Sequence, residues 1–431
     1  MTGMAGTSEH TPLDLPEGDP FGPHNLPYGV FSDGAPSDGA PSDGVFSDSA
    51  DGPAGARRVG VRIGDHVLDA GAAAQALGSP HAALLSAPTL DPLLAAGRTA
   101  WTDVRGALMS WLTEPAHRPT VLPFLRPLSE VTLHLPFEVA DYVDFYASEH
   151  HASNLGRLFR PDEEPLKPNW KHLPVGYHGR AGTVVVSGTD VVRPSGQRKG
   201  PSDPGPVFGP SLRLDIETEV GYVVGVPSAQ GTAVPLSAYR DHVFGVCLLN
   251  DWSARDIQSW ETVPLGPHLG KSFATSISAW ITPLDALDEA RVPAPPRTVP
   301  LLPYLDDGDP SLAPAGYDLR ITVSLNGHTI SEPPFSGMYW TGAQMLAHMT
   351  VNGASLRTGD LYGSGTISGP GAHERGSLIE MTWNGRQPLE LPDGKRGFLE
   401  DGDVVTLSAW APGPGGTRVA LGEVTGRITA P

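Results

Sequence analysis

Short runs of strand-forming residues, separated by turn residues, dominate the sequence from about residue 131 to its end. Runs such as GTVVVSG, EVGYVVG and DVVTLSAWA are rich in Val, Ile, Thr and aromatic residues, and glycine or proline stands between them. A few stretches, among them SARDIQSW and TGAQMLAHM, have helical spacing instead. Short strands that alternate with turns predict a mainly β (α+β) fold for this part of the chain.

The length of 431 residues exceeds what one ordinary hydrophobic core accommodates, so we expect two domains. Residues 1–58 form an acidic, Gly/Pro/Ser-rich segment in which Ser-Asp recurs about every five residues. This low-complexity insertion favours a flexible loop or linker, because its spacing matches no calcium-binding loop. We expect order to begin with two short strands at 58–70, a small domain over 59–130, and a large β-rich domain over 131–431.

Charge and cysteine content exclude several kinds of partner. The 48 acidic and 29 basic side chains give a net charge of −19, which argues against nucleic acid and anionic membranes and favours metal ions or small molecules. The single cysteine, Cys247, excludes an internal disulfide framework and fits a reducing compartment. With no signal-peptide pattern and no apolar run of roughly 18 residues, we expect a cytoplasmic protein.

Acidic residues in and beside the predicted strands are candidates for a cation site. In LRLDIETEVGYVVG, Asp215, Glu217 and Glu219 alternate and therefore share one face of a strand. Like charges on one face repel, so that face is either solvated or lies against something positive. If Asp144 and Asp251 converge on Glu217 and Glu219, they form an all-oxygen site of the kind that Ca²⁺ and Mg²⁺ bind. The alternative is that Glu217 and Glu219 face water.

The stretch NDWSARDIQSWETVPLGPHLGKSF holds donors for a developing negative charge. Arg255 and Gln258 are three residues apart and share one side of a predicted helix, which Asp251 starts. Lys271 follows after a Gly/Pro turn. Together these side chains suit an oxyanion forming on an attacked carbonyl. The alternative is a surface helix in which Arg255 pairs with Asp256.

A hydrolytic site also needs a nucleophile, for which activated water is the best candidate. The sequence has no G-x-S-x-G motif, and Cys247 lies in an apolar run, where a thiol is usually inert. His151 is the candidate base, because it is close to Asp144 in sequence. Glu380, alone in the predicted strand GSLIEMTW, is a candidate orienting acid, since an unpaired buried carboxylate is costly. The alternative is that His151 is structural.

Several long blocks resemble the fumarylacetoacetase family. They are DFYASEHHASNLGRLFRP, PNWKHLPVGYHGRAGTVVVSGT, LRLDIETEVGYVVG, LNDWSARDIQSWETVPLGPHLGKSFATSISAW and LRTGDLYGSGTISGP. The similarity runs from HNLPYGVFSDG (24–34) to the C-terminus, interrupted by the Ser-Asp-Gly insertion. The block RTGDLYGSGT marks only the wider superfamily, whereas NDWSARDIQ and LPVGYHGRA point to the family itself.

This resemblance implies a small SH3-like N-terminal barrel followed by a large C-terminal β-sandwich roll, assembled as a homodimer. It also implies hydrolysis of a carbon–carbon bond in 4-fumarylacetoacetate, giving fumarate and acetoacetate, in the last step of tyrosine and phenylalanine catabolism. The implied substrate is a small β-diketo acid, and the implied cofactor is a divalent cation, Ca²⁺ and/or Mg²⁺.

The resemblance also assigns roles to residues, motif by motif. The implied calcium ligands are Asp144, Glu217, Glu219 and Asp251. A second cation position, assigned to magnesium, matches Asp251, Lys271 and Thr275. The implied catalytic groups are the base His151, its orienting carboxylate Glu380, and the oxyanion donors Arg255, Gln258 and Lys271. The implied substrate contacts are Tyr146, Arg160, Tyr177, Gln258 and Thr366.

One departure from the family and two rival functions stay open. Thr262 in QSWET stands where the animal enzymes have a tyrosine that contacts substrate, so that contact is in doubt. One rival is another superfamily enzyme, such as an acylpyruvate hydrolase or oxaloacetate decarboxylase, which usually lacks the N-terminal domain. The other is a non-catalytic metal-binding β-protein, which needs neither His151 nor Lys271.

Overall fold

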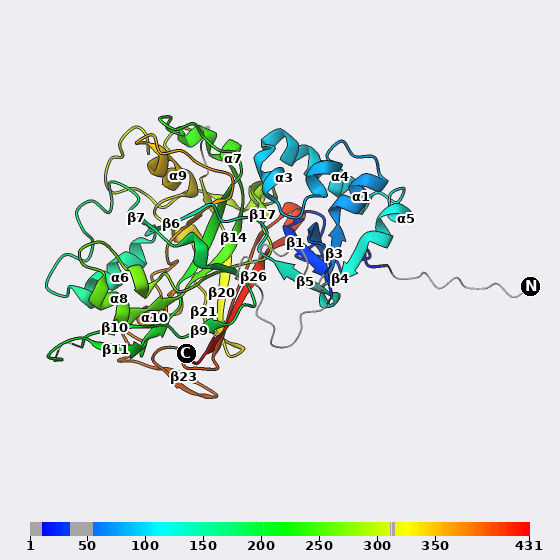
Figure 1. The fold of residues 1–431 in the computed structure, drawn as a ribbon. Helices are drawn as coiled ribbons and strands as arrows, with labels where there is room; N and C mark the ends of the chain where they lie inside the picture. The colour runs from blue at the N-terminus through cyan, green and yellow to red at the C-terminus, as the bar shows by residue number, and fades with distance from the viewer. Residues whose placement is uncertain (1–10, 35–54, 201, 311, 313–314) are drawn as a thin grey trace, which may run out of the picture.

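The computed structural model describes residues 11–34, 55–200, 202–310, 312 and 315–431. Its fold is mainly β, as predicted, with curled sheets and a minority of helix. Figure 1 shows a smaller N-terminal part, coloured blue to cyan, beside a larger part formed by the rest of the chain. Among the helices of the described residues, none combines the length and apolar character needed to cross a membrane.

The N-terminal part is built on one five-stranded antiparallel sheet in the order β4-β3-β2-β1-β5. Its strands are β1 (Tyr28–Asp33), β2 (Arg58–Ile63), β3 (His66–Asp69), β4 (Leu125–Pro127) and β5 (Val131–His134). The accompanying helices are α1 (Ala70–Ala76), α2 (Ala82–Leu85), α3 (Asp91–Ala95), α4 (Arg98–Thr113) and α5 (Arg118–Val121). The buried face of α4, including Trp101 and Leu108, packs into the same core as Val30 and Val61 of the sheet.

The expectation that order begins at residue 58 is wrong. Strand β1 pairs with both β2 and β5, so it lies inside the sheet and not in a linker. Tyr28, Val30 and Phe31 are buried there, and that apolar area stabilises the pairing. Strand β5 likewise takes residues 131–134 into the first sheet. The greater part of the predicted loop, residues 1–10 and 35–54, lies outside the described residues.

The larger part contains an eight-stranded sheet at its centre. Along the sheet the strands run β7 (Gly176–His178), β6 (Asp141–Phe145), β22 (Asp360–Gly363), β13 (Thr218–Val224), β14 (Val243–Asp251), β16 (Thr275–Ile277) and β8 (Val184–Val186), with β17 (Thr282–Pro283) paired to β14. The β6–β22 and β8–β16 pairs are parallel and the others antiparallel. Every residue of β13 and β14 is buried, which explains their near-continuous apolar sequence.

A second, five-stranded sheet packs against this one. It contains β21 (His328–Ser331), β20 (Arg320–Leu325), β25 (Val404–Pro412), β26 (Arg418–Thr429) and β9 (Val191–Val192). Burial alternates strictly along β25, so one face of this sheet is turned inward. Leu407 of β25 and Leu421 of β26 share a core with Val220 of β13 and Leu248 of β14. The two sheets therefore enclose one hydrophobic core.

Short strand pairs and helices complete the larger part. The pairs are β10 (Ser195–Arg198) with β11 (Val207–Pro210), β12 (Leu214–Asp215) with β15 (Ser253–Ala254), β18 (Arg291–Val292) with β19 (Gly316–Tyr317), and β23 (Leu389–Leu391) with β24 (Gly394–Arg396). The helices are α6 (Glu149–Phe159), α7 (Tyr239–His242), α8 (Arg255–Glu261), α9 (Gly342–Thr350) and α10 (Leu378–Met381).

Three sequence predictions about local structure need correction. Glu380 does not lie in a strand, because Leu378–Met381 within GSLIEMTW form the short helix α10. The predicted strand around Asp215 is not continuous, since it is interrupted at Ile216 and Glu217 between β12 and β13. Asp251 ends β14 but does not start a helix, because α8 begins only at Arg255. Each change alters where a carboxylate points.

Candidate active site

Four buried carboxylates from neighbouring strands meet at one place in the eight-stranded sheet. Asp144 lies on β6, Glu219 on β13, Asp251 at the end of β14, and Glu217 directly before β13. Each offers an oxygen atom, and these four atoms all lie within 4.8 Å of one another. Glu217 is 5% exposed and Glu219 is fully buried, so neither faces water.

A glycine on the intervening strand lets these oxygens approach. Gly363 of β22 lies opposite Asp144 on one side and Gly221 of β13 on the other. A Cβ atom at Gly363 would lie 2.6 Å from Glu219 Oε2 and 3.2 Å from Asp144 Oδ1. The first distance is far shorter than a van der Waals contact, so a side chain here would displace the carboxylates. The carboxylate cluster therefore requires glycine at position 363, the second glycine of RTGDLYGSGT.

Replacing Gly363 by alanine is expected to abolish divalent-ion binding while leaving a folded protein, because the methyl group enters the space between two ligands. Isothermal titration with Ca²⁺ or Mg²⁺ measures this. Gly106→Ala is the matched control: Gly106 lies in α4 with nothing within 4 Å of an added Cβ, and alanine there should stabilise the protein by about 0.5–1 kcal/mol. Unchanged ion affinity in Gly363→Ala would contradict the steric argument.

Two oxygens of the cluster lack partners among the described residues, namely Asp144 Oδ1 and Glu219 Oε1. Burial, and then repulsion from neighbouring carboxylates, raises the pKa of both side chains well above the usual range. A bound cation would reverse both effects, and carboxylate oxygens are the ligands that hard divalent ions prefer. The residues present therefore fit a divalent cation.

Two basic side chains lie against the acidic cluster. Lys271 Nζ donates to Asp251 Oδ2 at 2.6 Å and also to Glu217. Arg255 Nη1 lies 2.7 Å from Glu217 Oε1. Burial opposes ionisation of Glu217, but Lys271 and Arg255 outweigh it and hold its pKa below the usual range. The acidic face is therefore not solvated; it lies against the positively charged side chains Lys271 and Arg255.

Arg255 is buried and does not form the surface pair with Asp256. It sits on α8, with Nε donating to Asp215 Oδ2 at 2.7 Å and Nη1 donating to Gln258 Oε1 at 3.1 Å. The Asp256 carboxylate instead accepts from Ser211 and from the backbone of Leu212. Arg255 Nη2 has no partner among the described residues, so it is a buried donor available to a ligand.

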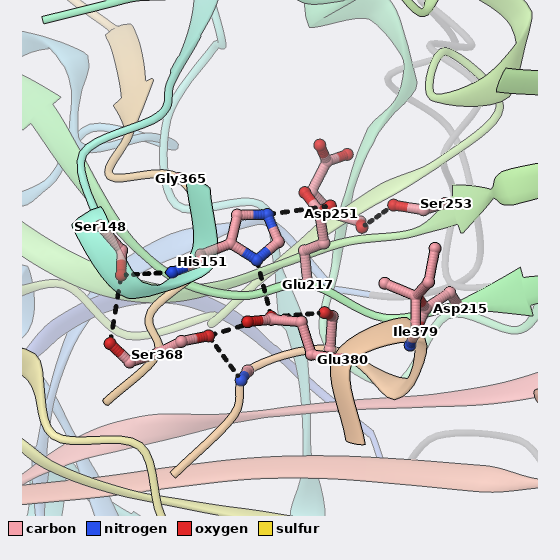
Figure 2. Close-up of polar contacts among 12 residues, drawn as sticks. Ser148, His151, Asp215, Glu217, Asp251, Ser253, Gly365, Ser368, Ile379 and Glu380 are labelled. Carbon is pink, nitrogen blue, oxygen red and sulfur yellow. Dashed lines mark hydrogen bonds and ion pairs between the residues drawn. The ribbon is translucent and has the colours of Figure 1, made fainter. Parts of the chain in front are cut away.

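His151 and Glu380 form a buried pair beside the cluster (Figure 2). His151 Nδ1 lies 2.6 Å from Glu380 Oε2, and Nε2 lies 3.9 Å from Glu217 Oε1. Although burial disfavours the Glu380 anion, His151 and further donors lower the Glu380 pKa. An ionised Glu380 accepts the Nδ1 proton, which leaves Nε2 as the acceptor that can take a proton.

Three polar side chains that the sequence analysis missed hold Glu380 in place. Asn154 Nδ2 donates to Oε1 at 2.9 Å, while the Ser368 and Ser377 hydroxyls donate to Oε2 at 3.0 and 2.7 Å. Asn154 follows His151 by three residues on α6, so it was accessible from helical spacing. The two serines precede Glu380 in a turn-rich stretch and carry no comparable signal.

The N-terminus of α6 fixes the backbone of His151. Ser148 is its N-cap residue: its hydroxyl accepts from His151 N at 3.2 Å and donates to the Ser368 carbonyl at 3.1 Å. The rings of Tyr146 and His151 meet edge to face, with centroids 5.2 Å apart. The imidazole is therefore held by its ring nitrogen, its backbone and a neighbouring ring.

The remaining predicted site residues lie at differing distances from the cluster. Thr275 Oγ1 donates to Asp251 Oδ1 at 3.3 Å, and the Tyr177 hydroxyl donates to Asp251 Oδ2 at 3.5 Å. Thr366 is buried, and its hydroxyl has no partner among the described residues. Arg160 donates to the Pro165 carbonyl at 3.1 Å and lies at the end of α6.

Two other residues near the site qualify the sequence analysis. The Tyr142 hydroxyl is buried without a partner among the described residues, and Asp251, Asp144 and Glu219 help burial to raise its pKa. It was missed, because a tyrosine in a strand usually reads as core. Thr262, the departure from the family, is the C-cap residue that follows α8, and its backbone N–H donates to the Gln258 carbonyl at 2.9 Å.

Comparison with known proteins gives matches over nearly the whole chain. Residues 43–136 match the family model for the fumarylacetoacetase N-terminal region, and residues 141–429 match that for the fumarylacetoacetate hydrolase C-terminal region. Fumarylacetoacetase of Homo sapiens is 41% identical, covering 96% of this chain and 98% of its own. That of Arabidopsis thaliana is 42% identical, covering 96% and 97%. A solved fumarylacetoacetate hydrolase from Exiguobacterium antarcticum, 16% identical with a TM-score of 0.53, covers 94% of this chain and 100% of its own, and shares the fold.

Proposed function

The chain belongs to the fumarylacetoacetase family, and from that premise we propose that it hydrolyses the carbon–carbon bond of 4-fumarylacetoacetate to give fumarate and acetoacetate. It is thus a hydrolase that acts on a small β-diketo acid. The observation that carries the proposal is the buried His151–Glu380 pair, with His151 Nε2 3.9 Å from the carboxylate cluster. A base, a cation site and oxyanion donors then converge on one position.

In this proposal Asp144, Glu217, Glu219 and Asp251 hold a divalent cation, Ca²⁺ and/or Mg²⁺. Lys271 and Thr275, which contact Asp251, belong to the second cation position. A bound divalent ion supplies Lewis-acid chemistry toward the two oxygens of a β-diketone. The unpartnered oxygens of Asp144 and Glu219 support this assignment.

The chain's own groups carry the proton transfers and the charge. His151 Nε2 takes a proton from water, and the water oxygen bonds to the carbonyl carbon that becomes a carboxylate of fumarate. Arg255, Gln258 and Lys271 donate hydrogen bonds to the oxyanion. As that intermediate collapses, the carbon–carbon bond breaks and its electron pair leaves with the acetoacetate carbon. That carbon then accepts the proton held by His151, and the second proton of the water stays on the new carboxyl group until it passes to solvent as the carboxylate forms.

Four substrate contacts complete the proposed site. Tyr146, Arg160, Tyr177 and Thr366 are assigned to the substrate alongside Gln258. Burial, followed by the charges of Glu217 and Glu380, raises the pKa of Tyr146, so its hydroxyl stays protonated and can donate to a substrate oxygen.

The finer parts of the proposal come from the family. We propose a cytoplasmic homodimer that completes tyrosine and phenylalanine catabolism. The N-terminal part, whose sheet includes β1 and β5, would be an SH3-like barrel, and the larger part that follows it a β-sandwich roll.

Loss of fumarylacetoacetate absorbance, followed with and without a chelator, tests the proposed function. We expect turnover with Ca²⁺ or Mg²⁺, its loss with the chelator, and its return when the ion is added back. Acylpyruvates and oxaloacetate are assayed separately as alternative substrates. Preferred turnover of one of these would favour another superfamily enzyme, and ion-dependent melting without turnover would favour a non-catalytic metal-binding protein.

A further inference from the structure

The carboxylate of Asp215 is fully buried and connects two parts of the proposed site. Its Oδ2 accepts from Arg255 Nε at 2.7 Å and from the backbone N–H of Ile379 at 3.0 Å. Its Oδ1 accepts from the backbone N–H groups of Leu378 and Ile216, each at 2.7 Å. Asp215 therefore binds a side chain of α8 and the backbone of α10 with the same carboxylate.

On the side of α8, Asp215 determines which nitrogen of Arg255 is free. Asp215 takes Nε, while Glu217 and Gln258 take Nη1. A guanidinium group is planar, so fixing Nε and Nη1 also fixes the direction of Nη2. Nη2 is the nitrogen without a partner among the described residues, and it is the one left for the oxyanion.

On the side of α10, Asp215 fixes the backbone that carries Glu380. Leu378 and Ile379 directly precede Glu380, and Figure 2 shows Asp215 beside Ile379 at the start of this helix. Glu380 in turn lies 2.6 Å from His151 Nδ1. A helix of four residues makes few backbone bonds of its own, and the two bonds to Asp215 fix the N–H groups of its first two residues.

We propose that Asp215 is a positioning residue that sets the oxyanion donor Arg255 and the base-orienting Glu380 relative to each other. This inference rests on the proposed function, because it assumes those two roles. Asp215 is not one of the four residues of the carboxylate cluster, and its link to that cluster runs through Arg255, whose Nη1 lies 2.7 Å from Glu217 Oε1. Its negative charge also compensates a buried guanidinium that would otherwise be costly.

Asp215→Asn tests the proposal with little change of shape. An amide has one acceptor oxygen and one NH₂ group, so in either orientation the NH₂ group meets N–H donors on one side. We expect kcat to fall about 100-fold, as for small misplacements of catalytic groups, with KM and the affinity for Ca²⁺ or Mg²⁺ nearly unchanged. Asp215→Ser leaves room for a water molecule as acceptor and should show the same loss of kcat. It serves as the test variant if Asp215→Asn does not fold.

Double-mutant cycles distinguish positioning from a general loss of stability. If Asp215 acts through both partners, its effect on kcat combines non-additively with Arg255→Lys and also with Glu380→Gln. Asp403→Asn is the matched control, since Asp403 is 2% exposed and accepts from Arg396 Nε at 3.0 Å and from Glu400 N at 2.8 Å. This control variant should lose stability but keep kcat.

Four results would overturn the proposal: normal kcat in Asp215→Asn, loss of ion binding in that variant, coupling to only one of the two partners, or an equal loss of kcat in Asp403→Asn. Absence of turnover in the unsubstituted protein is a different result, because it refutes the proposed function itself.

Discussion

His151→Ala is expected to lower kcat by about 10²–10⁴-fold, the range that a positioned general base contributes. The imidazole is the only group of the buried His151–Glu380 pair that presents a proton acceptor toward the cluster, because Glu380 is taken up by hydrogen bonds from His151, Asn154, Ser368 and Ser377. His151 is not among the four clustered carboxylates, so ion affinity should persist. Steady-state kinetics and calorimetric titration with Ca²⁺ or Mg²⁺ measure the two quantities.

His150→Ala controls for changes to α6 itself. His150 is the preceding residue of that helix and is partly exposed. Its removal should leave kcat and ion affinity as they are. Near-normal turnover in His151→Ala would refute the assignment of the base, whereas equal losses in both variants would point to damage of the helix.

Glu219→Gln is expected to weaken divalent-ion binding by more than about 100-fold, since even the loss of a partner that merely orients a ligand costs about 10–100-fold. Turnover should fall with it. Glu219 is fully buried, and its Oε2 is already held by Gly365 N at 3.0 Å, so the amide can keep its place while losing the charge. The same expectation holds for Asp144→Asn.

Thermal melting tests the same prediction, because the stability of Glu219→Gln relative to the unsubstituted protein should differ with and without the ion. At an ion concentration 100 times its dissociation constant, the unsubstituted protein gains about 2.7 kcal/mol of stability, whereas a variant with 100-fold weaker binding gains about 0.4 kcal/mol. In chelator, Glu219→Gln should melt no lower than the unsubstituted protein, because one of several crowded carboxylates is gone. Glu390→Gln, on an exposed hairpin, should match the unsubstituted protein in both conditions. A variant that still gains the full ion-dependent stability would exclude Glu219 as a ligand.

The fold class was predictable because strand patterns repeat along most of the chain; β13 and β14 lie in apolar runs, the first with Glu219 near its start and the second ending at Asp251. Strand β1 was not found, because its few residues stand directly before the acidic repeat and lack a second strand beside them in sequence. Helix α10 was misread because four residues are too few to show a helical period. Its first backbone N–H groups donate to Asp215, a partner 163 residues away from Leu378 that periodicity does not reveal.

The candidate site was predictable as a set of residue types but not as a set of contacts. The alternation of Asp215, Glu217 and Glu219 suggested one shared face. The break between β12 and β13 instead leaves Asp215 outside the cluster, bonded to Arg255 and to the backbone of α10. Gly363 was within reach, since a glycine inside a strand often marks a close approach of other atoms. The free nitrogen of Arg255 was not, because it depends on which other atoms take Nε and Nη1.

The distance in sequence between His151 and Glu380, 229 residues, also bears on how the protein becomes active during synthesis. A chain still emerging from the ribosome has its imidazole long before the carboxylate that lies 2.6 Å from it in the folded protein. Truncation anywhere upstream of α10 leaves an incomplete enzyme, however well the earlier strands have formed. Such long-range pairings are made late and slowly, so activity should be the last property that the newborn polypeptide acquires.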